Sequence, residues 1–294
     1  MDPRVLDRLR CPVCGEPLAE VTTGTTAALR CPRRHSFDIA RQGYVNLLAG
    51  RAPHAGDSAE MMAARADFLA AGHYDLIPAA LADAASQAVR HLRETRPEAA
   101  VLDAYPLVVD AGAGTGRYLG AVLAALPDAV GLALDVSKPA LRRAARAHPR
   151  AAAALADTWQ RLPLADASTA VLLNVFAPRN GPEFHRVLDP AGALLVVTPA
   201  ADHLTELVDA LDLLRVDPDK ADRVAGSLGG HFTPVGSALH RAELTLTRPE
   251  VATLVGMGPS AWHTDPAALA ARLAALPEPV RVTVAIRLDV SRPR

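Results

Sequence analysis

The stretch Val108–Gly116, with the sequence Val-Val-Asp-Ala-Gly-Ala-Gly-Thr-Gly, constrains the fold of this 294-residue chain more than any other. Two β-branched residues lead into an aspartate and a turn with three alternating glycines, and residues Tyr118–Leu126 then follow a helical pattern. A strand, a glycine turn and a helix in this order are typical of a nucleotide-binding βα unit. Glycines permit positive φ angles and close approach of a ligand, and the helix N-terminus offers free N–H donors. A tight βα turn without a ligand is the alternative interpretation of this motif alone.

Acidic residues at the ends of successive predicted strands distinguish between cofactors. Asp110 stands at the mouth of the glycine turn, where it would repel a pyrophosphate but attract the cationic methionine end of S-adenosylmethionine. Leu132–Asp135 predicts a second strand whose terminal acid can accept hydrogen bonds from ribose hydroxyls, a feature that nicotinamide cofactors share. A third strand, Ala153–Asp157, also ends in an acid, with Trp159 nearby as a rim for an adenine ring. The pattern favours S-adenosylmethionine, with Asp110, Gly112, Gly114, Gly116, Asp135 and Asp157 as the expected cofactor-binding residues.

The remaining elements predict an α/β fold of the class I S-adenosylmethionine-dependent methyltransferase type, which is Rossmann-like. Its seven-stranded mixed sheet would carry helices on both faces. The further expected strands are Ala170–Val175, Leu194–Thr198, Ala242–Leu246 and Val280–Leu288, and the further expected helices are Ile77–Leu92, Glu183–Leu188 and Leu204–Leu214.

All three cysteines lie in the first 31 residues, where Cys11-Pro-Val-Cys14 is followed by Cys31-Pro-Arg-Arg-His35. Three thiolates and one imidazole at this spacing are the ligand set of a closed, tetrahedral structural zinc site. A redox Cys-x-x-Cys pair is the alternative, but it would leave Cys31 and His35 without a role. We therefore expect an N-terminal zinc ribbon, in which the metal links two turns of a segment too short to form its own core.

Charge and hydropathy exclude some classes of protein. The formal net charge is -1, so no global basic field indicates nucleic acid binding. Residues 1–51 contain eight arginines against five acids, an excess compatible with either an RNA-binding surface or an ordinary solvated one. No run of residues reaches the length of a membrane span, and Met1–Arg10 has no apolar signal-peptide core. We expect a cytoplasmic protein with no membrane association.

Between ribbon and glycine motif, the pattern predicts a helical linker. Asp57 or Ser58 can cap a helix in which Met61, Met62, Arg65, Phe68 and Leu69 recur near helical spacing, and the helix would end at residues 71–74. Before it, the alternating stretch Phe37–Leu48 predicts a short strand or extended arm that closes the ribbon, and Arg93–Pro106 would lead into the first strand of the sheet. The expected domains are a zinc-ribbon RNA-recognition domain (1–50), a helical linker (51–104) and a methyltransferase domain (105–294).

The chain resembles the bacterial 23S rRNA (guanine-N1-)-methyltransferases over nearly its whole length. The resemblance is carried by the ribbon, Gly43–Leu48, Gly56–Met62 with Ala64-Arg65, Ala71–Tyr74, and Asp135–Lys138. Val175–Asn180, Arg143–Arg150 and Met257–Ser260 with Trp262-His263 are most similar to the actinomycete branch, which includes macrolide self-resistance enzymes.

The resemblance implies functional residues that the motifs alone do not reveal. It makes Cys11, Cys14, Cys31 and His35 zinc ligands, and it places Tyr74, Gly114, Thr115 and His203 at the cofactor. It also implies transfer of a methyl group to N1 of a guanine in a hairpin loop of 23S rRNA near the peptide exit tunnel, by a homodimer. Whether the purpose is macrolide resistance or housekeeping stays open.

The residues after the fourth strand bear on the chemistry. Asn174-Val175-Phe176-Ala177-Pro178 lacks the Asn/Asp-Pro-Pro-aromatic motif of enzymes that methylate exocyclic amines, so a ring nitrogen is the better target. Phe176 could stack on an exposed base or pack on the next helix. N1 of guanine must lose its proton; Asp157, His203 and solvent are all conceivable acceptors, and no catalytic residue is assigned. A small-molecule methyltransferase and a non-catalytic RNA-binding factor are the competing functions.

Overall fold

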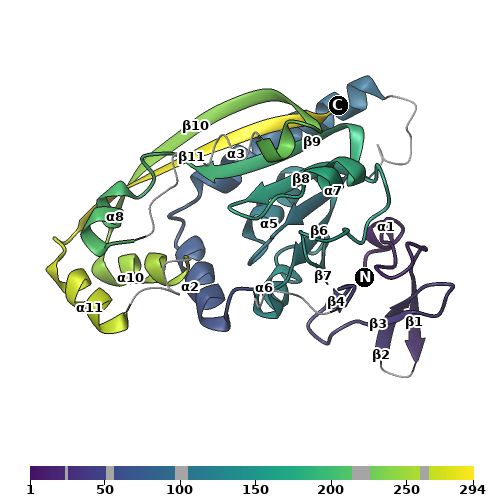
Figure 1. Ribbon diagram of the computed structural model, residues 1–294, viewed down its shortest axis with the longest axis horizontal. Coiled ribbons are helices and arrows are strands. Elements are labelled where there is room, and N and C mark those ends of the chain that lie inside the picture. Colours follow the sequence, from purple (N-terminus) through teal and green to yellow (C-terminus); the bar gives the residue numbers. More distant parts are fainter. Residues whose placement is uncertain (24–25, 51–55, 97–104, 214–225, 259–264) are drawn as a thin grey trace.

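The computed structural model describes residues 1–23, 26–50, 56–96, 105–213, 226–258 and 265–294 (Figure 1). Its centre is a mixed sheet in which the strands follow the order β10-β11-β9-β8-β5-β6-β7-β4. The neighbours from β4 to β9 pair in parallel, whereas β11 is antiparallel to both β9 and β10. The bounds are β4 Tyr44–Asn46, β5 Leu107–Ala111, β6 Val130–Asp135, β7 Ala151–Leu155, β8 Thr169–Val175, β9 Leu188–Pro199, β10 Phe232–Leu246 and β11 Val280–Pro293.

The expected class I arrangement is confirmed, with one strand more than the seven predicted among the described residues. The additional strand is β4, which the sequence pattern assigned to an arm closing the ribbon. Instead, Tyr44 pairs with Ala153 at the edge of the large sheet. The reason is burial, because Tyr44 and Val45 are 8% and 0% exposed there.

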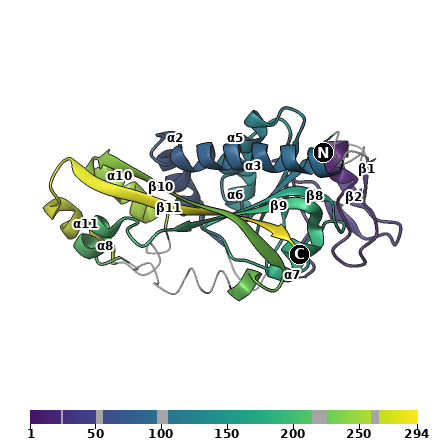
Figure 2. The same cartoon turned by 90° about the horizontal axis from the view of Figure 1, so that it is seen from above.

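Helices cover both faces of this sheet (Figure 2). On one face lie α2, α3 and α5, and α7 lies on the other. The helices are α1 Pro3–Leu6, α2 Ala59–Ala70, α3 Leu76–Thr95, α5 Arg117–Ala125, α6 Lys138–Ala144, α7 Gly181–Val187, α8 Thr205–Leu211, α10 Arg248–Gly256 and α11 Pro266–Ala275. No helix in the described ranges combines the length and the apolar composition that crossing a bilayer requires.

The central strands are buried on both faces, and alternate residues serve two separate cores. Val108 belongs to a cluster that includes Leu81 of α3 and Leu119 of α5. Val109, its neighbour in β5, belongs to a second cluster with Phe184 of α7 and ribbon residues such as Leu9. The period of two along a strand produces this division, because successive side chains point to opposite faces.

The ribbon is a three-stranded antiparallel sheet of β1 Ala19–Thr23, β2 Thr26–Arg30 and β3 Ser36–Asp38. It is joined to the large sheet by main-chain contacts as well as by the shared core. Leu9 forms an isolated antiparallel bridge with Leu164, and the Arg10 N–H donates to the Pro163 carbonyl at 3.0 Å. The metal-bearing segment is therefore held against the transferase sheet rather than tethered loosely to it.

Several boundaries differ from the sequence prediction. Ser58, not Asp57, caps α2, since its hydroxyl accepts from the Met61 N–H at 3.2 Å. The strand expected at Ala242–Leu246 is only the end of β10, whose outer part is exposed and so lacked an apolar signal. Helix α3 continues to Thr95, within the stretch predicted to be non-helical. Residues 97–104, Leu214, and the Pro259, Ser260, Trp262 and His263 of the family resemblance lie outside the described residues.

Candidate functional site

The glycine turn lies between β5 and α5, as predicted, and its geometry demands glycine. Gly112 has φ +84°, and a Cβ added there would lie 2.5 Å from the Cβ of Ala177. Gly116 has φ +78°, and its added Cβ would lie 2.8 Å from Cα of Ala144. Backbones therefore approach each other too closely at this turn for any side chain, and Gly114 and the half-buried Thr115 complete it. The N–H groups of Gly112 and Ala113 donate to the Leu134 carbonyl and that of Gly116 donates to the Ala113 carbonyl, so the turn is held by its own main-chain hydrogen bonds.

Asp110, the last acid before the turn, is fully buried. Neither of its carboxylate oxygens has a hydrogen-bond partner among the described residues. Burial, followed by the nearby charge of Asp135, raises the pKa of Asp110 to about 7. A buried acceptor with no donor lowers the stability of a folded protein. A bound ligand with a cationic amino group would supply the missing donor.

Asp135 fixes the turn from the neighbouring strand. Its Oδ2 accepts from the Gly114 N–H and its Oδ1 accepts from the Ser137 N–H, both at 2.8 Å. Burial nevertheless raises the pKa of Asp135 above its usual range. Each carboxylate oxygen keeps a lone pair beyond these contacts, so the group can still accept from a ribose hydroxyl.

Asp157 and Trp159 follow β7 at the same end of the sheet. The Asp157 Oδ1 accepts from the Trp159 N–H at 2.9 Å, whereas its buried Oδ2 has no partner among the described residues. The Trp159 side chain is 57% exposed. The structure thus puts Asp157 in a position to accept another hydrogen bond and leaves the indole of Trp159 largely in solvent.

Tyr74 and His203 lie 129 residues apart in the sequence and meet in the structure. The Tyr74 oxygen is 3.4 Å from Nε2 of His203, and the Ala285 N–H donates to Nδ1 of His203 at 3.2 Å. Because Nδ1 accepts, the neutral imidazole carries its proton on Nε2 and donates it to Tyr74. The Tyr74 O–H is then free to donate elsewhere. The ring centroid of Phe176 also lies 6.1 Å from that of His203.

Arg65 of α2 is a site residue to which the sequence gave no role. Its guanidinium pairs with Asp57 at 2.7 Å and donates to the Met257 carbonyl at 2.7 Å. A Cβ added to Gly114 would lie 3.4 Å from an Arg65 nitrogen, so the guanidinium lies directly over the glycine turn. The sequence signals were its charge on the otherwise apolar face of α2 and its place in the Ala64-Arg65 motif of the family resemblance.

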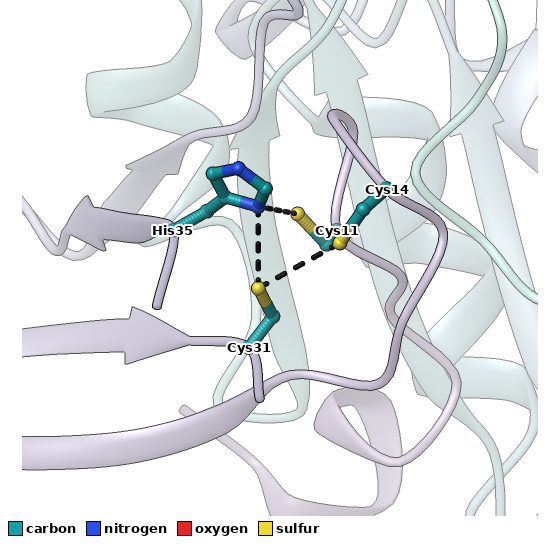
Figure 3. A group of neighbouring side chains, drawn as sticks. All are labelled: Cys11, Cys14, Cys31 and His35. Atoms are coloured by element: carbon teal, nitrogen blue, oxygen red, sulfur yellow. Dashed lines mark hydrogen bonds between the residues drawn. The ribbon is translucent and has the colours of Figure 1, made fainter. Parts of the chain in front are cut away.

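The predicted metal ligands form a compact cluster at the base of the ribbon (Figure 3). Nδ1 of His35 lies 3.5 Å from Sγ of Cys11 and 3.4 Å from Sγ of Cys31, and the Sγ atoms of Cys14 and Cys31 are 3.7 Å apart. A tetrahedron with metal distances of ~2.3 Å to sulfur and ~2.0 Å to nitrogen has edges of about 3.8 and 3.5 Å. All three cysteines are free of disulfides. The four side chains therefore fit a closed structural zinc site, and the redox interpretation is not needed.

Comparison with known proteins places both parts of the chain. Residues 9–52 match the zinc-ribbon family described as RlmA, N-terminal. A protein of Micromonospora griseorubida, provisionally named a 23S rRNA (guanine-N(1)-)-methyltransferase, is 70% identical over all of both chains. The 23S rRNA (guanine(748)-N(1))-methyltransferase of Streptomyces fradiae is 49% identical, over 100% of this chain and 99% of its own. The chain belongs to the 23S rRNA (guanine-N1-)-methyltransferase family.

A more distant similarity concerns a solved structure. A methyltransferase of Thiobacillus denitrificans in complex with S-adenosylhomocysteine superposes with a TM-score of 0.41 at 18% identity, over 65% of this chain and 86% of its own.

A family member needs S-adenosylmethionine, and the observed site fits that cofactor. The unpartnered, buried carboxylate of Asp110 matches a cationic amino group. The glycines let this turn pack closely against Ala144 and Ala177, where a Cβ would collide with the protein itself. The site offers acceptors at Asp135 and Asp157 on successive strands, which suit ribose and adenine donors.

Proposed function

We propose that this chain transfers the methyl group of S-adenosylmethionine to N1 of a guanine in 23S rRNA. The observation that carries the proposal is 49% identity, over essentially both full lengths, to a relative named for methylation at N1 of guanine 748 of 23S rRNA. The similarity includes the ribbon as well as the transferase domain, so it covers more than a fold that many substrates share.

The chemistry divides between cofactor and protein. Bound S-adenosylmethionine would supply the methyl group, with its C–S bond broken as the C–N1 bond is formed, and the N1 proton would leave to an acceptor that we do not assign. The protein binds and orients. Asp110, the glycine turn from Gly112 to Gly116, Asp135 and Asp157 would hold the cofactor, and Tyr74 and His203 would form one wall. Positioning of the two reacting atoms supplies most of the rate acceleration in such a mechanism.

RNA recognition is assigned to the ribbon. We propose the division into a ribbon domain (1–50), a linker (51–104) and a transferase domain (105–294), with the ribbon's arginines contacting phosphates. Support comes from the main-chain bridge between Leu9 and Leu164, which holds the ribbon at a fixed place beside the transferase sheet. A ribbon bound to RNA at a fixed distance from the cofactor site would place one particular nucleotide at that site.

Finer parts of the proposal follow from the same family. The target would be a hairpin-loop guanine beside the exit tunnel, the enzyme would act as a homodimer in the bacterial cytoplasm, and methylation would lower macrolide sensitivity. Sedimentation of the purified protein tests the dimer. Expression in a macrolide-sensitive host without this modification tests resistance: an unchanged inhibitory concentration despite complete methylation would remove that role.

The decisive experiment is incubation of the purified chain with labelled S-adenosylmethionine and unmethylated 23S rRNA transcript. Primer extension locates the modified nucleotide, and nucleoside mass spectrometry identifies it. We expect 1-methylguanosine at one hairpin-loop position, and none with an Asp110→Ala variant. Label that enters a small metabolite, or no transfer at all, would overturn the proposal.

A further inference from the structure

Phe176 is an aromatic residue in a conformation that its side chain disfavours. It directly follows β8 and has φ +52°, in the left-handed region that a bulky L-residue rarely adopts. Its side chain remains 40% exposed, so burial of the ring does not compensate for this backbone. An observed outlier of this kind at the end of a central strand is a reason to search for function.

The main chain around Phe176 is fixed from two sides. The Phe176 N–H donates to the Val197 carbonyl of β9 at 3.1 Å. The buried Asn174 amide donates to the carbonyls of Ala111 at 3.2 Å and Pro178 at 2.8 Å, so it links the end of β5 to the loop after β8. The left-handed turn is therefore built into the sheet edge and is not a feature of a loose loop.

Phe176 directly precedes a residue that packs on the glycine turn. Ala177, the next residue, packs so closely on Gly112 that a Cβ on that glycine would lie 2.5 Å from the Ala177 Cβ. The ring centroids of Phe176 and His203 are 6.1 Å apart at an angle of 36°. Phe176 thus neighbours His203 in space and Ala177 in sequence, and part of its surface is open.

We propose that the exposed ring of Phe176 is the stacking platform for the target purine. This inference rests on the proposed methyl transfer to RNA. A base that leaves its helix or loop loses stacking, and an aromatic face at the entrance of the pocket restores it. The braced, left-handed backbone presents that face without further rearrangement, which keeps the base beside the methyl donor. The guanine ring rather than the cofactor is the partner of this side chain.

The proposal is tested by four substitutions of Phe176 in the full-length protein. Phe176→Leu keeps an apolar side chain but removes the aromatic face. Phe176→Asn also removes the ring, and asparagine accepts the left-handed backbone more readily, so its fold is not put at risk. Phe176→Tyr and Phe176→Trp keep a face on which a base can stack.

Three quantities are measured on each variant: the KM for unmethylated 23S rRNA transcript, the affinity for S-adenosylhomocysteine by calorimetry, and the unfolding temperature. Loss of one base–aromatic stack should raise the RNA KM by roughly 5- to 100-fold in the leucine and asparagine variants. The cofactor affinity and the unfolding temperature of the asparagine variant should not fall. The tyrosine and tryptophan variants should stay within about threefold of the wild-type KM, because stacking tolerates any aromatic face.

The outcomes separate this inference from the function on which it rests. A wild-type protein that methylates no RNA overturns the proposed function and the platform with it. If the wild type is active but the leucine and asparagine variants keep its RNA KM, Phe176 is no platform while the function stands. A weakened affinity for S-adenosylhomocysteine in the same variants, with an unchanged RNA KM, would assign the ring to the cofactor instead.

Discussion

The hydroxyl oxygen of Tyr74 lies 3.4 Å from Nε2 of His203. This contact joins the connection between α2 and α3 to the loop after β9. The Ala285 N–H occupies Nδ1 of the same ring, so the imidazole donates to Tyr74 and leaves the Tyr74 O–H available. Burial raises the pKa of Tyr74 above its ordinary value, so the phenol is protonated at neutral pH.

Tyr74→Phe should therefore remove a donor while keeping the edge-to-face contact with Phe68, whose ring centroid is 5.1 Å away. We expect the affinity for S-adenosylhomocysteine to fall by about 3- to 10-fold, the effect of one neutral hydrogen bond. Calorimetry measures it, and Tyr105→Phe, at an exposed tyrosine outside the site, is the control. An affinity equal to that of the wild type would remove Tyr74 from the cofactor site.

Asp110 predicts a pH dependence of cofactor binding. Its pKa of about 7 in the ligand-free protein means that the carboxylate is largely protonated at pH 6 and ionised at pH 8. A cationic amino group binds the ionised form, so the affinity for S-adenosylhomocysteine should rise with pH, by up to about tenfold per unit below the pKa. Titration calorimetry from pH 5.5 to 8.5 measures this. The Asp110→Asn variant should bind weakly and without the pH dependence; a wild-type affinity that stays flat over this range would contradict the assignment.

The same carboxylate should destabilise the ligand-free protein at high pH. Its folded pKa, about 7, exceeds the ordinary value of 3.8, so between these values the folded state binds the proton and the unfolded state does not. The stability due to this group is full below about pH 4 and is lost as the pH rises through 7. Asp110→Asn should be more stable than wild type at pH 8, by on the order of 1–3 kcal/mol, and equal to it near pH 4. Thermal unfolding of both proteins at pH 4 and pH 8 measures this difference. An Asp110→Asn variant less stable than wild type at pH 8 would show that the protein compensates the charge of Asp110.

Gly112 and Ala177 form a steric pair that a double-mutant cycle can resolve. Gly112→Ala places a Cβ 2.5 Å from the Ala177 Cβ and imposes a side chain on φ +84°, so we expect a loss of about 2–4 kcal/mol and of cofactor binding. Adding Ala177→Gly removes the collision but not the backbone strain, so the double variant should recover part of the loss.

Gly230→Ala is the matched control, because an added Cβ there meets no atom within 4 Å. Denaturant unfolding of the wild type, the single variants Gly112→Ala and Ala177→Gly, and the double variant gives the coupling energy. Strictly additive effects of the two substitutions would show that the two residues do not restrict each other.

Removal of the ribbon metal should unfold the N-terminal segment and weaken the second core. The sulfur ligands Cys11 and Cys31 are buried in the cluster that also contains Leu9 and Val109, so the ribbon and the transferase sheet share packing. We expect the purified protein to contain one zinc ion per chain. Cys31→Ser should lose it, expose the remaining thiols to a titrating reagent and lower the unfolding temperature by several degrees.

Arg33→Ser, between two ligands but with a side chain 68% exposed, is the control and should keep its zinc. Elemental analysis and thiol titration provide the measurements. A Cys31→Ser protein with full metal content and wild-type stability would exclude a structural zinc held by these four residues.

Local sequence determined the features that depend on neighbouring residues. The β-branched residues of β5 and the glycines after it specify a strand and a turn, since glycine readily adopts the positive φ values found at Gly112 and Gly116. The spacing of Cys11 with Cys14 and of Cys31 with His35 specifies two ligand-bearing turns, because each pair must converge on one metal.

The tertiary structure decided what depends on residues far apart. It placed β4 in the large sheet because Tyr44 and Val45 are buried there, while their alternation was equally compatible with the ribbon. It brought both Tyr74 and the exposed ring of Phe176 to His203. Contacts between residues so far apart cannot be predicted from a local pattern. They depend on the order of the strands and on the packing of the helices, which together determine which loops meet at the carboxyl edge of a parallel sheet.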